Sequence, residues 1–160
     1  MAALIRNAQP GDEQLIGDFA VRLFDQHVGY DAKRFSAFAN VDGAARFYRS
    51  RFETPDSVVL VAEVDGEVVG FAYLERDDLN YAGLLEKGAW LHDIYVDEAT
   101  RAEGVGKSLI TAAAKAAKRM GAEKLLLTVA AKNFAAQKVF EKAGFRPTMV
   151  EMTLNLPEIS

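Results

Sequence analysis

Hydrophobic and polar positions along the chain follow two different periods, which predict alternating strands and helices. Residues 3–8 and 57–76 are rich in β-branched and alternating apolar positions, which is typical of strands. Asp65-Gly66 divides the second stretch and is favoured in a two-residue hairpin turn. Apolar runs predict further strands over residues 89–96, 123–130 and 145–156, and residues 77–88 are expected to form a loop.

Apolar residues recur every three or four positions between these strands, which predicts helices. Pro10-Gly11-Asp12 breaks the first strand, Gly121 and Gly144 each follow a helical pattern, and Asn133 begins one. The expected helices cover about residues 12–27, 42–52, 106–120 and 133–143.

This order of elements predicts one α/β (α+β) domain over residues 3–160, built around a single mixed sheet. Short hairpins imply antiparallel neighbours for most strands. The passage from Trp90 to Ala130 is a strand, a helix and a strand, which implies one parallel pair with a right-handed crossover. Ligands of such sheets tend to lie at the carboxyl ends of the parallel strands.

Composition narrows the classes of protein only slightly. Half of the 160 residues are hydrophobic and the formal net charge is −4, which argues against a nucleic-acid partner. The absence of cysteine excludes disulfides and thiolate metal sites, and no metal is expected. No stretch is apolar and long enough for a signal peptide or a membrane span, so we expect a cytoplasmic protein without a membrane partner.

The stretch RAEGVG, residues 101–106, lies at the carboxyl end of the 89–96 strand and opens a helix. Glycine in a helix costs roughly 1 kcal/mol of stability relative to alanine. We therefore expect either that the backbone comes very close to another group or that the turn has a conformation that other residues resist. Backbone amides of such a turn, with Arg101 beside them, would bind an anion. The spacing differs from that of a P-loop or a dinucleotide fingerprint, and a plain turn without a ligand is the alternative.

Two longer stretches carry a family resemblance. LHDIYVDEATRAEGVGKSLI is followed by LTVAAKNFAAQKVFEKAGFRPT, in which Asn133, Ala136, Phe140, Gly144 and Phe145 hold a recurrent spacing. Together they resemble the Gcn5-related N-acetyltransferase (GNAT) superfamily, whose acyl-CoA motif R-x-x-G-x-G opens a helix after a strand. The resemblance implies a central, mostly antiparallel sheet with a splayed parallel pair, flanked by about four helices.

The resemblance implies that the cosubstrate is acetyl-CoA. Backbone amides of the glycine turn and the end of the preceding strand would hold it. Asn133 would reach the pantetheine arm, although a helix N-cap is an equally good account of it. The implied cofactor-binding residues are Ile94, Tyr95, Val96, Arg101, Ala102, Glu103, Gly104, Val105, Gly106, Lys107, Ser108, Asn133, Ala136 and Phe140.

For catalysis, the resemblance implies direct attack of a primary amine on the thioester. His92 is the expected base, and the Val96 amide the expected oxyanion donor. Asp93 is a second candidate, but strand neighbours point to opposite faces unless a bulge intervenes. The sequence departs from the family at Phe140, where a tyrosine is usual, and at Trp90 and His92, where relatives carry glutamate.

The resemblance also implies that the first two helices and their connection wall the acceptor pocket, and the candidate substrate-binding residues are His27, Tyr30, Asp31 and Tyr73. A small-molecule amine is the expected partner. After Phe145 only one strand is expected, so a seventh strand is either missing or supplied by a second chain, and a homodimer is one expectation. An acyl-CoA-binding module without transferase activity is the alternative function.

Overall fold

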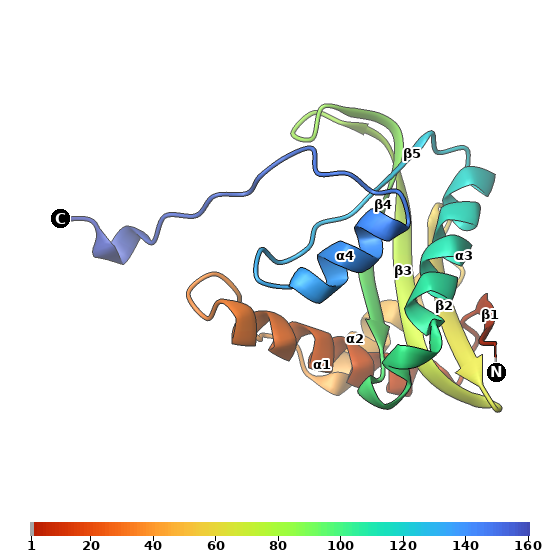
Figure 1. Cartoon of the computed structure of the whole chain (residues 1–160). Helices are drawn as coiled ribbons and strands as arrows, with labels where there is room; N and C mark the ends of the chain where they lie inside the picture. Colours follow the sequence, from red (N-terminus) through yellow and green to blue (C-terminus); the bar gives the residue numbers. More distant parts are fainter. Residues whose placement is uncertain (1) are drawn as a thin grey trace.

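A five-stranded sheet in the order β1-β2-β3-β4-β5 forms the centre of the molecule (Figure 1). The computed structural model describes residues 2–160, except for the side chains of residues 101–103. Its strands are β1 (Leu4–Asn7), β2 (Ser57–Val64), β3 (Glu67–Asn80), β4 (Leu85–Val96) and β5 (Lys124–Leu126). The first four are antiparallel neighbours, and β4 and β5 are parallel, as predicted.

Four α-helices accompany the sheet within the described residues, with two short 3₁₀ turns, η1 (Glu98–Glu103) and η2 (Leu156–Glu158). They are α1 (Glu13–Tyr30), α2 (Val41–Arg51), α3 (Val105–Arg119) and α4 (Phe134–Lys142). The helix bounds lie close to those predicted, although α1 continues past His27 to Tyr30. Gly121 and Gly144 have positive φ beyond the ends of α3 and α4, as their positions predicted.

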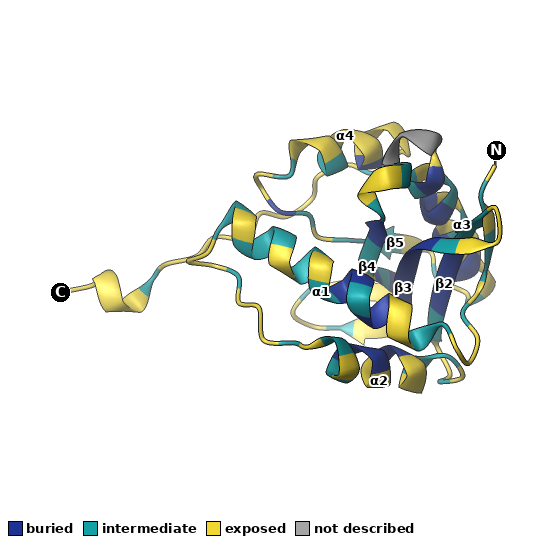
Figure 2. Ribbon diagram, turned by 90° about the horizontal axis from the view of Figure 1, so that it is seen from below, coloured by how far each residue is buried: buried dark blue, intermediate teal, exposed yellow. Residues whose placement is uncertain are grey.

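Two apolar layers cover opposite faces of the sheet (Figure 2). Leu109 and the alanines of α3 pack on Leu74 and Leu91, which alternate with residues of the other face. On that other face, Ile16 of α1 and Tyr48 of α2 pack on Phe71 and its neighbours. Both faces are therefore buried around residues 69–74 of β3, whereas the residues of β3 after Leu74 are at least partly exposed.

The hairpin between β2 and β3 turns at Asp65 and Gly66, both with positive φ, as the sequence predicted. The next hairpin differs from prediction because residues 77–88 are mostly strand, with only 81–84 as the turn. Leu85 is buried and Asn80 accepts a hydrogen bond from the Gly83 amide at 2.8 Å, so pairing and turn contacts outweigh the weak strand propensity of DDLN.

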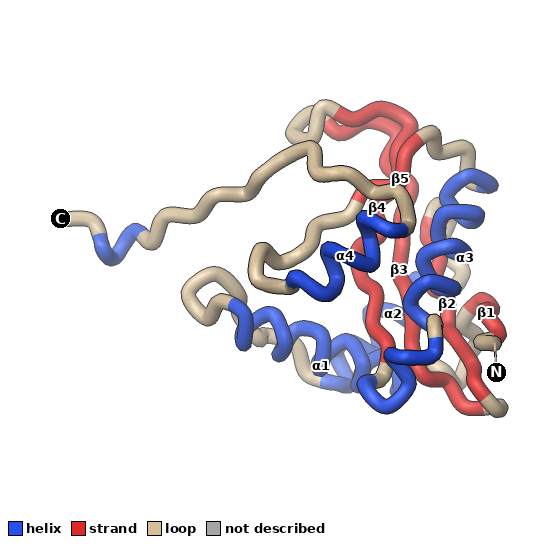
Figure 3. Tube along the Cα trace, viewed as in Figure 1, coloured by secondary structure: helices blue, strands red, loops and turns tan. Residues whose placement is uncertain are grey.

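Two predicted strands are shorter than expected or missing. Residues 123–130 contribute only the three residues of β5 to the sheet. The strand expected over residues 145–156 is not formed: after α4 the chain is extended without a pairing partner in the described structure (Figure 3). A lone strand is not stable without another strand to pair with.

No described helix has the length and apolar character that crossing a bilayer requires.

Candidate active site

A β-bulge in β4 is the first feature of the candidate site. Tyr73 of β3 pairs with Asp93, but the next residue, Leu74, pairs with Leu91, so His92 is an extra residue in β4. The bulge breaks the alternation that would put His92 and Asp93 on opposite faces. His92 stacks on the Tyr73 ring at 5.4 Å between centroids, while Asp93 accepts a hydrogen bond from Tyr48. The predicted pair is thus brought to the face that α1 and α2 cover.

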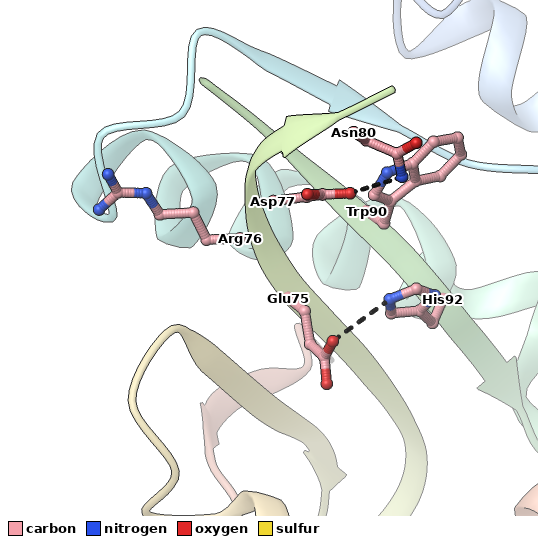
Figure 4. A pocket seen from close by; sticks show the side chains of 6 residues that line it. All are labelled: Glu75, Arg76, Asp77, Asn80, Trp90 and His92. Atoms are coloured by element: carbon pink, nitrogen blue, oxygen red, sulfur yellow. Dashed lines mark hydrogen bonds and ion pairs between the residues drawn. The ribbon is translucent and has the colours of Figure 1, made fainter. Parts of the chain in front are cut away.

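His92 faces a carboxylate that the sequence did not single out. Its Nε2 lies 3.8 Å from Oε2 of Glu75 on β3, and Figure 4 shows the two side chains pointing toward one another. The other oxygen of Glu75 accepts a hydrogen bond from the Tyr73 hydroxyl and lies 3.8 Å from the Arg51 guanidinium. The carboxylate is therefore held by two groups and can stabilise a protonated imidazole.

Asp93 has a different environment. Tyr48 donates a hydrogen bond of 2.7 Å to its carboxylate, and the Tyr48 ring is buried between Phe71 and Tyr73. Burial raises the pKa of Asp93 above its ordinary value, while the Tyr48 hydroxyl and the nearby charges of His92 and His27 oppose that rise. Burial and the adjacent carboxylate also raise the pKa of Tyr48, so it remains a hydrogen-bond donor.

A pocket of about 380 Å³ opens beside His92. Glu75, Asp77 and Asn80 of β3 and Trp90 and His92 of β4 line it (Figure 4), whereas Arg76 also lines it but extends away from His92 and pairs with Asp78 at 2.6 Å. Asn80 donates to Asp77 at 2.8 Å. The Trp90 indole N–H is buried and has no hydrogen-bond partner among the described residues. The pocket thus combines carboxylates with a donor that a polar ligand could satisfy.

The glycine turn lies at the other end of β4. Gly104 has φ +76° and caps the start of α3, and a β-carbon there would have no atom within 4 Å, so its outer side is open. The Val105 side chain is buried in the core, so only its backbone can face a ligand. Lys107 is exposed, and Ser108 donates to the Gly104 carbonyl at 3.2 Å. The predicted contacts of the Arg101, Ala102 and Glu103 side chains lie outside the described residues.

Between the turn and the pocket, β4 and β5 diverge. Their pairing covers only Gly88–Trp90 of β4 and stops at Leu126 of β5. The remaining predicted cofactor-binding residues lie along and after this divergence: Ile94 packs against the α3 layer, and the Tyr95 ring is buried 5.4 Å from Phe19. The observed divergence matches the expected splayed pair.

At α4, Asn133 accepts a hydrogen bond from the Ala136 amide at 3.1 Å and is therefore the N-cap of the helix. This confirms that Asn133 is a helix N-cap, whereas its contact with the pantetheine arm stays a prediction. Phe140 is buried and packs edge-on against Phe145, 5.8 Å between ring centroids.

The candidate acceptor residues are only partly brought together. Tyr73 lies in the His92 cluster. His27, Tyr30 and Asp31 gather instead at the end of α1, where Tyr30 and Phe35 pack against the His27 ring and Asp31 accepts from the Lys33 amide. His27 is still close enough for its charge to influence Asp93.

Sequence reasoning missed Glu75, Tyr48 and Arg51. Alternation along β3 does put Phe71, Tyr73 and Glu75 on one face, which was a usable signal. The pairing of Glu75 with His92 was not predictable, because it depends on a one-residue bulge. No group of three or more His, Asp or Glu side chains within the described part of the chain is arranged to hold a metal ion.

Comparison with known proteins agrees with this geometry. The model of the acetyltransferase (GNAT) family matches residues 22–145. An uncharacterised N-acetyltransferase of Bacillus subtilis, YhfO, is 30% identical over 156 residues, covering 96% of this chain and 97% of its own. The chain belongs to the GNAT family of acetyltransferases.

Solved structures share the fold. A mutant of the BH1408 protein from Bacillus halodurans superposes with a TM-score of 0.83 at 20% identity, over 96% of this chain and 99% of that one. The aminoglycoside N-acetyltransferase AAC(6')-Iy, in complex with CoA, gives 0.78 at 19% identity, over 96% and 94%. At these identities the similarity is one of fold.

Proposed function

We propose that this GNAT protein transfers the acetyl group of acetyl-CoA to a primary amine of a small molecule. The observation that carries the proposal is the contact between His92 and Glu75 in a pocket beside the diverging ends of β4 and β5. A base next to an opening in the sheet is the arrangement that attack on a thioester needs.

Acetyl-CoA fits the glycine turn on two grounds. The left-handed Gly104 has open space where a β-carbon would stand, so a phosphate can approach the backbone at the start of α3. The divergence of β4 and β5 leaves a place for an extended pantetheine arm to lie along β4. AAC(6')-Iy, which has the same fold, forms a complex with CoA, and this supports CoA as a ligand of the fold.

The chemistry of the transfer assigns a role to each group. His92 Nε2 takes the proton from the acceptor ammonium, and Glu75 stabilises the imidazolium that forms. The neutral nitrogen attacks the thioester carbonyl, and the Val96 amide donates to the oxyanion. The C–S bond then breaks, and the CoA thiolate that leaves takes up the second proton that the nitrogen loses as the amide forms, giving free CoA thiol. Asp93, positioned by Tyr48, adds a second carboxyl group to this face of β4.

A polar, cationic acceptor suits the pocket. Glu75 and Asp77 supply negative charge, and the Trp90 indole N–H offers a donor for an acceptor oxygen. A complex of AAC(6')-Iy with a bisubstrate analogue of CoA and a monomethyl-acetylneamine has the same fold, with a TM-score of 0.79, which supports a small-molecule acceptor. One relative, from Sulfurisphaera tokodaii, is named an N-alpha-acetyltransferase, which makes protein N-termini the acceptor class to test against it.

The test is release of CoA thiol from acetyl-CoA with a panel of polyamines, aminoglycosides, amino acids and N-terminal peptides. His92→Gln should lower kcat/KM for the preferred amine by ~10²–10⁴-fold, the usual contribution of general base catalysis. Lys87→Gln, an exposed change on the same strand but outside the pocket, should leave it unchanged. Equal rates for His92→Gln and the wild type would exclude His92 as the base.

A second function is favoured by one observation. Phe140 stands where GNAT proteins usually have tyrosine, and its ring is buried against Phe145 without a proton to donate. An acyl-CoA-binding module would bind acetyl-CoA and release no thiol with any amine of the panel. Thiol release with a single amine would exclude it.

A further inference from the structure

The pocket beside His92 has two ends with different chemistry. Glu75 and His92 lie at one end, while Asp77, Asn80 and Trp90 gather at the other (Figure 4). The proton transfer of the proposed reaction takes place at the first end. The second end holds a carboxylate, an amide and an indole ring, none of which takes part in that proton transfer.

Asp77 is the carboxylate of the second end. It lies two residues after Glu75 on β3, so the two side chains are on the same face and about 7 Å apart along the strand. Asn80 donates a hydrogen bond to the Asp77 carboxylate at 2.8 Å, and it accepts one from the Gly83 amide, also at 2.8 Å. The turn between β3 and β4 therefore holds the Asp77 carboxylate in place.

The negative charge of Asp77 is not matched by the protein. Within the part of the chain that the structure describes, Asp77 forms no ion pair, whereas its neighbours do: Glu75 lies 3.8 Å from Arg51, and Asp78 lies 2.6 Å from Arg76. Arg76 extends away from the pocket, so it does not neutralise Asp77 (Figure 4). Asp77 is only partly exposed, and a charge withdrawn from water is stabilised by an opposite charge. A cationic group of a ligand would supply that charge.

Trp90 forms the wall of the pocket opposite these carboxylates. It pairs with Glu75 in the register of β3 and β4, and its ring lies 3.8 Å from the position that a β-carbon of Gly83 would take. The ring therefore extends along the pocket from the level of Glu75 to the turn. The face of an indole ring attracts cations and also packs against methylene groups.

We propose that Asp77 is a specificity-determining residue for the acceptor and that the preferred acceptor is a diamine. One nitrogen lies at His92 and is acetylated, while the second nitrogen, as an ammonium, pairs with Asp77. An extended chain with C–C and C–N bonds of about 1.5 Å covers ~7 Å when four or five methylene groups separate its nitrogens. Trp90 packs along that chain. The inference rests on the proposed function, because it places the first nitrogen at the proposed base.

Binding can be measured without any reaction. Trp90 is the only tryptophan of the chain, so its fluorescence reports on this pocket. Titrations of the full chain, with CoA present, compare diaminobutane, which has an amino group at each end, with butylamine, which has the same length and one charge. Diaminobutane should bind at least tenfold more tightly. Asp77→Asn should remove this preference, since the amide keeps the size of the side chain and loses its charge. Asp78→Asn, at an exposed neighbour outside the pocket, should keep it.

Release of CoA thiol separates this inference from the proposed transfer. Among diamines with two to seven methylene groups, kcat/KM of the wild type should be highest at four or five. Asp77→Asn should lower that value tenfold or more and leave the rate with butylamine unchanged. Tighter binding of diaminobutane without thiol release supports recognition by Asp77 and contradicts the transfer. Equal binding of diaminobutane and butylamine to the wild type, or an unchanged preference in Asp77→Asn, overturns the inference, whichever amine the protein acetylates.

Discussion

At the scale of single residues, two carboxyl groups of the site have opposite surroundings. Glu75 is half-exposed and faces His92, whereas Asp93 is enclosed and receives the Tyr48 hydroxyl. Burial raises the pKa of Asp93, so its surroundings differ from those of Glu75, and different surroundings of two carboxyl groups separate acid and base roles in active sites. The bulge at His92 makes this difference possible, since it brings His92 and Asp93 to the same face of the sheet.

Replacing Asp93 by asparagine should remove a pH dependence of stability. Because burial raises its pKa, the folded protein holds the Asp93 proton more tightly than the unfolded chain does. From its ordinary pKa of 3.8 up to the raised folded value, unfolding releases that proton, so the free energy of unfolding falls as pH rises. Urea unfolding of the wild type and Asp93→Asn at stepped pH measures this, and the wild type should lose stability relative to the variant. A difference that stays constant across that window would contradict the assignment.

The sequence alone singled out His92 and Asp93 as candidates, but not the residues that contact them. A single residue can be picked out by its chemistry and its place near a glycine turn. Its neighbours across the sheet depend on register, and an unpredicted bulge shifts the register by one residue between Tyr73 and Leu74. Glu75 and Tyr48 became visible only when the strands and α2 were placed.

At the scale of elements, the glycine turn and the far end of α3 provide a matched pair of substitutions. Gly104 and Gly121 both have positive φ and open surroundings, +76° and +87°. Either change to alanine should destabilise the protein by about 1 kcal/mol, because a side chain disfavours the left-handed region. Only Gly104→Ala should weaken CoA binding, by tenfold or more in a titration, since its β-carbon occupies the approach to the turn. Equal CoA affinity in both variants would contradict the assigned role of the turn.

Packing of α1 on α2 allows a second matched pair. A β-carbon on Gly17 would lie 2.6 Å from the Val41 carbonyl oxygen and 2.9 Å from the Ala45 amide nitrogen, both backbone atoms. Gly17→Ala should therefore separate the helices and destabilise the fold by ~1–3 kcal/mol. Gly29, in the same helix, has open space, and Gly29→Ala should instead add up to about 1 kcal/mol. Denaturant unfolding of the two variants gives the comparison, and equal effects would show that α1 and α2 do not pack this closely.

Elements with strong local signals were predicted well, and those that depend on distant partners were not. The Asp65-Gly66 hairpin and the glycine ends of α3 and α4 follow from backbone preferences of a few residues. Residues 77–80 became strand through pairing with β4, against their composition. Residues 145–156 have a strand pattern but remain unpaired in the described structure, because a pattern of apolar positions does not determine which strand lies alongside.

At the scale of the whole molecule, the site depends on how the sheet opens. β4 is bound to β3 along its length but to β5 only over Gly88–Trp90, so the sheet is closed at one end and divided at the other. The pocket beside His92 and the turn at Gly104 lie on either side of the divided part of β4. A cosubstrate that binds both at the turn and in the pocket would therefore contact the part of β4 that β5 leaves unpaired.

Acetyl-CoA should consequently stabilise the whole molecule against heat. A ligand at ~100 times its Kd adds ~2.7 kcal/mol, which raises the Tm of a domain of this size by roughly 5–10 °C. Unfolding is followed at one fixed chain concentration, because dimer formation also shifts Tm. CoA should stabilise similarly and NAD should not, and Gly104→Ala should show a smaller shift than Gly121→Ala at the same acetyl-CoA concentration. If a folded sample shows no shift with acetyl-CoA, residues 101–106 form a turn without a ligand, and the proposed transfer fails with it.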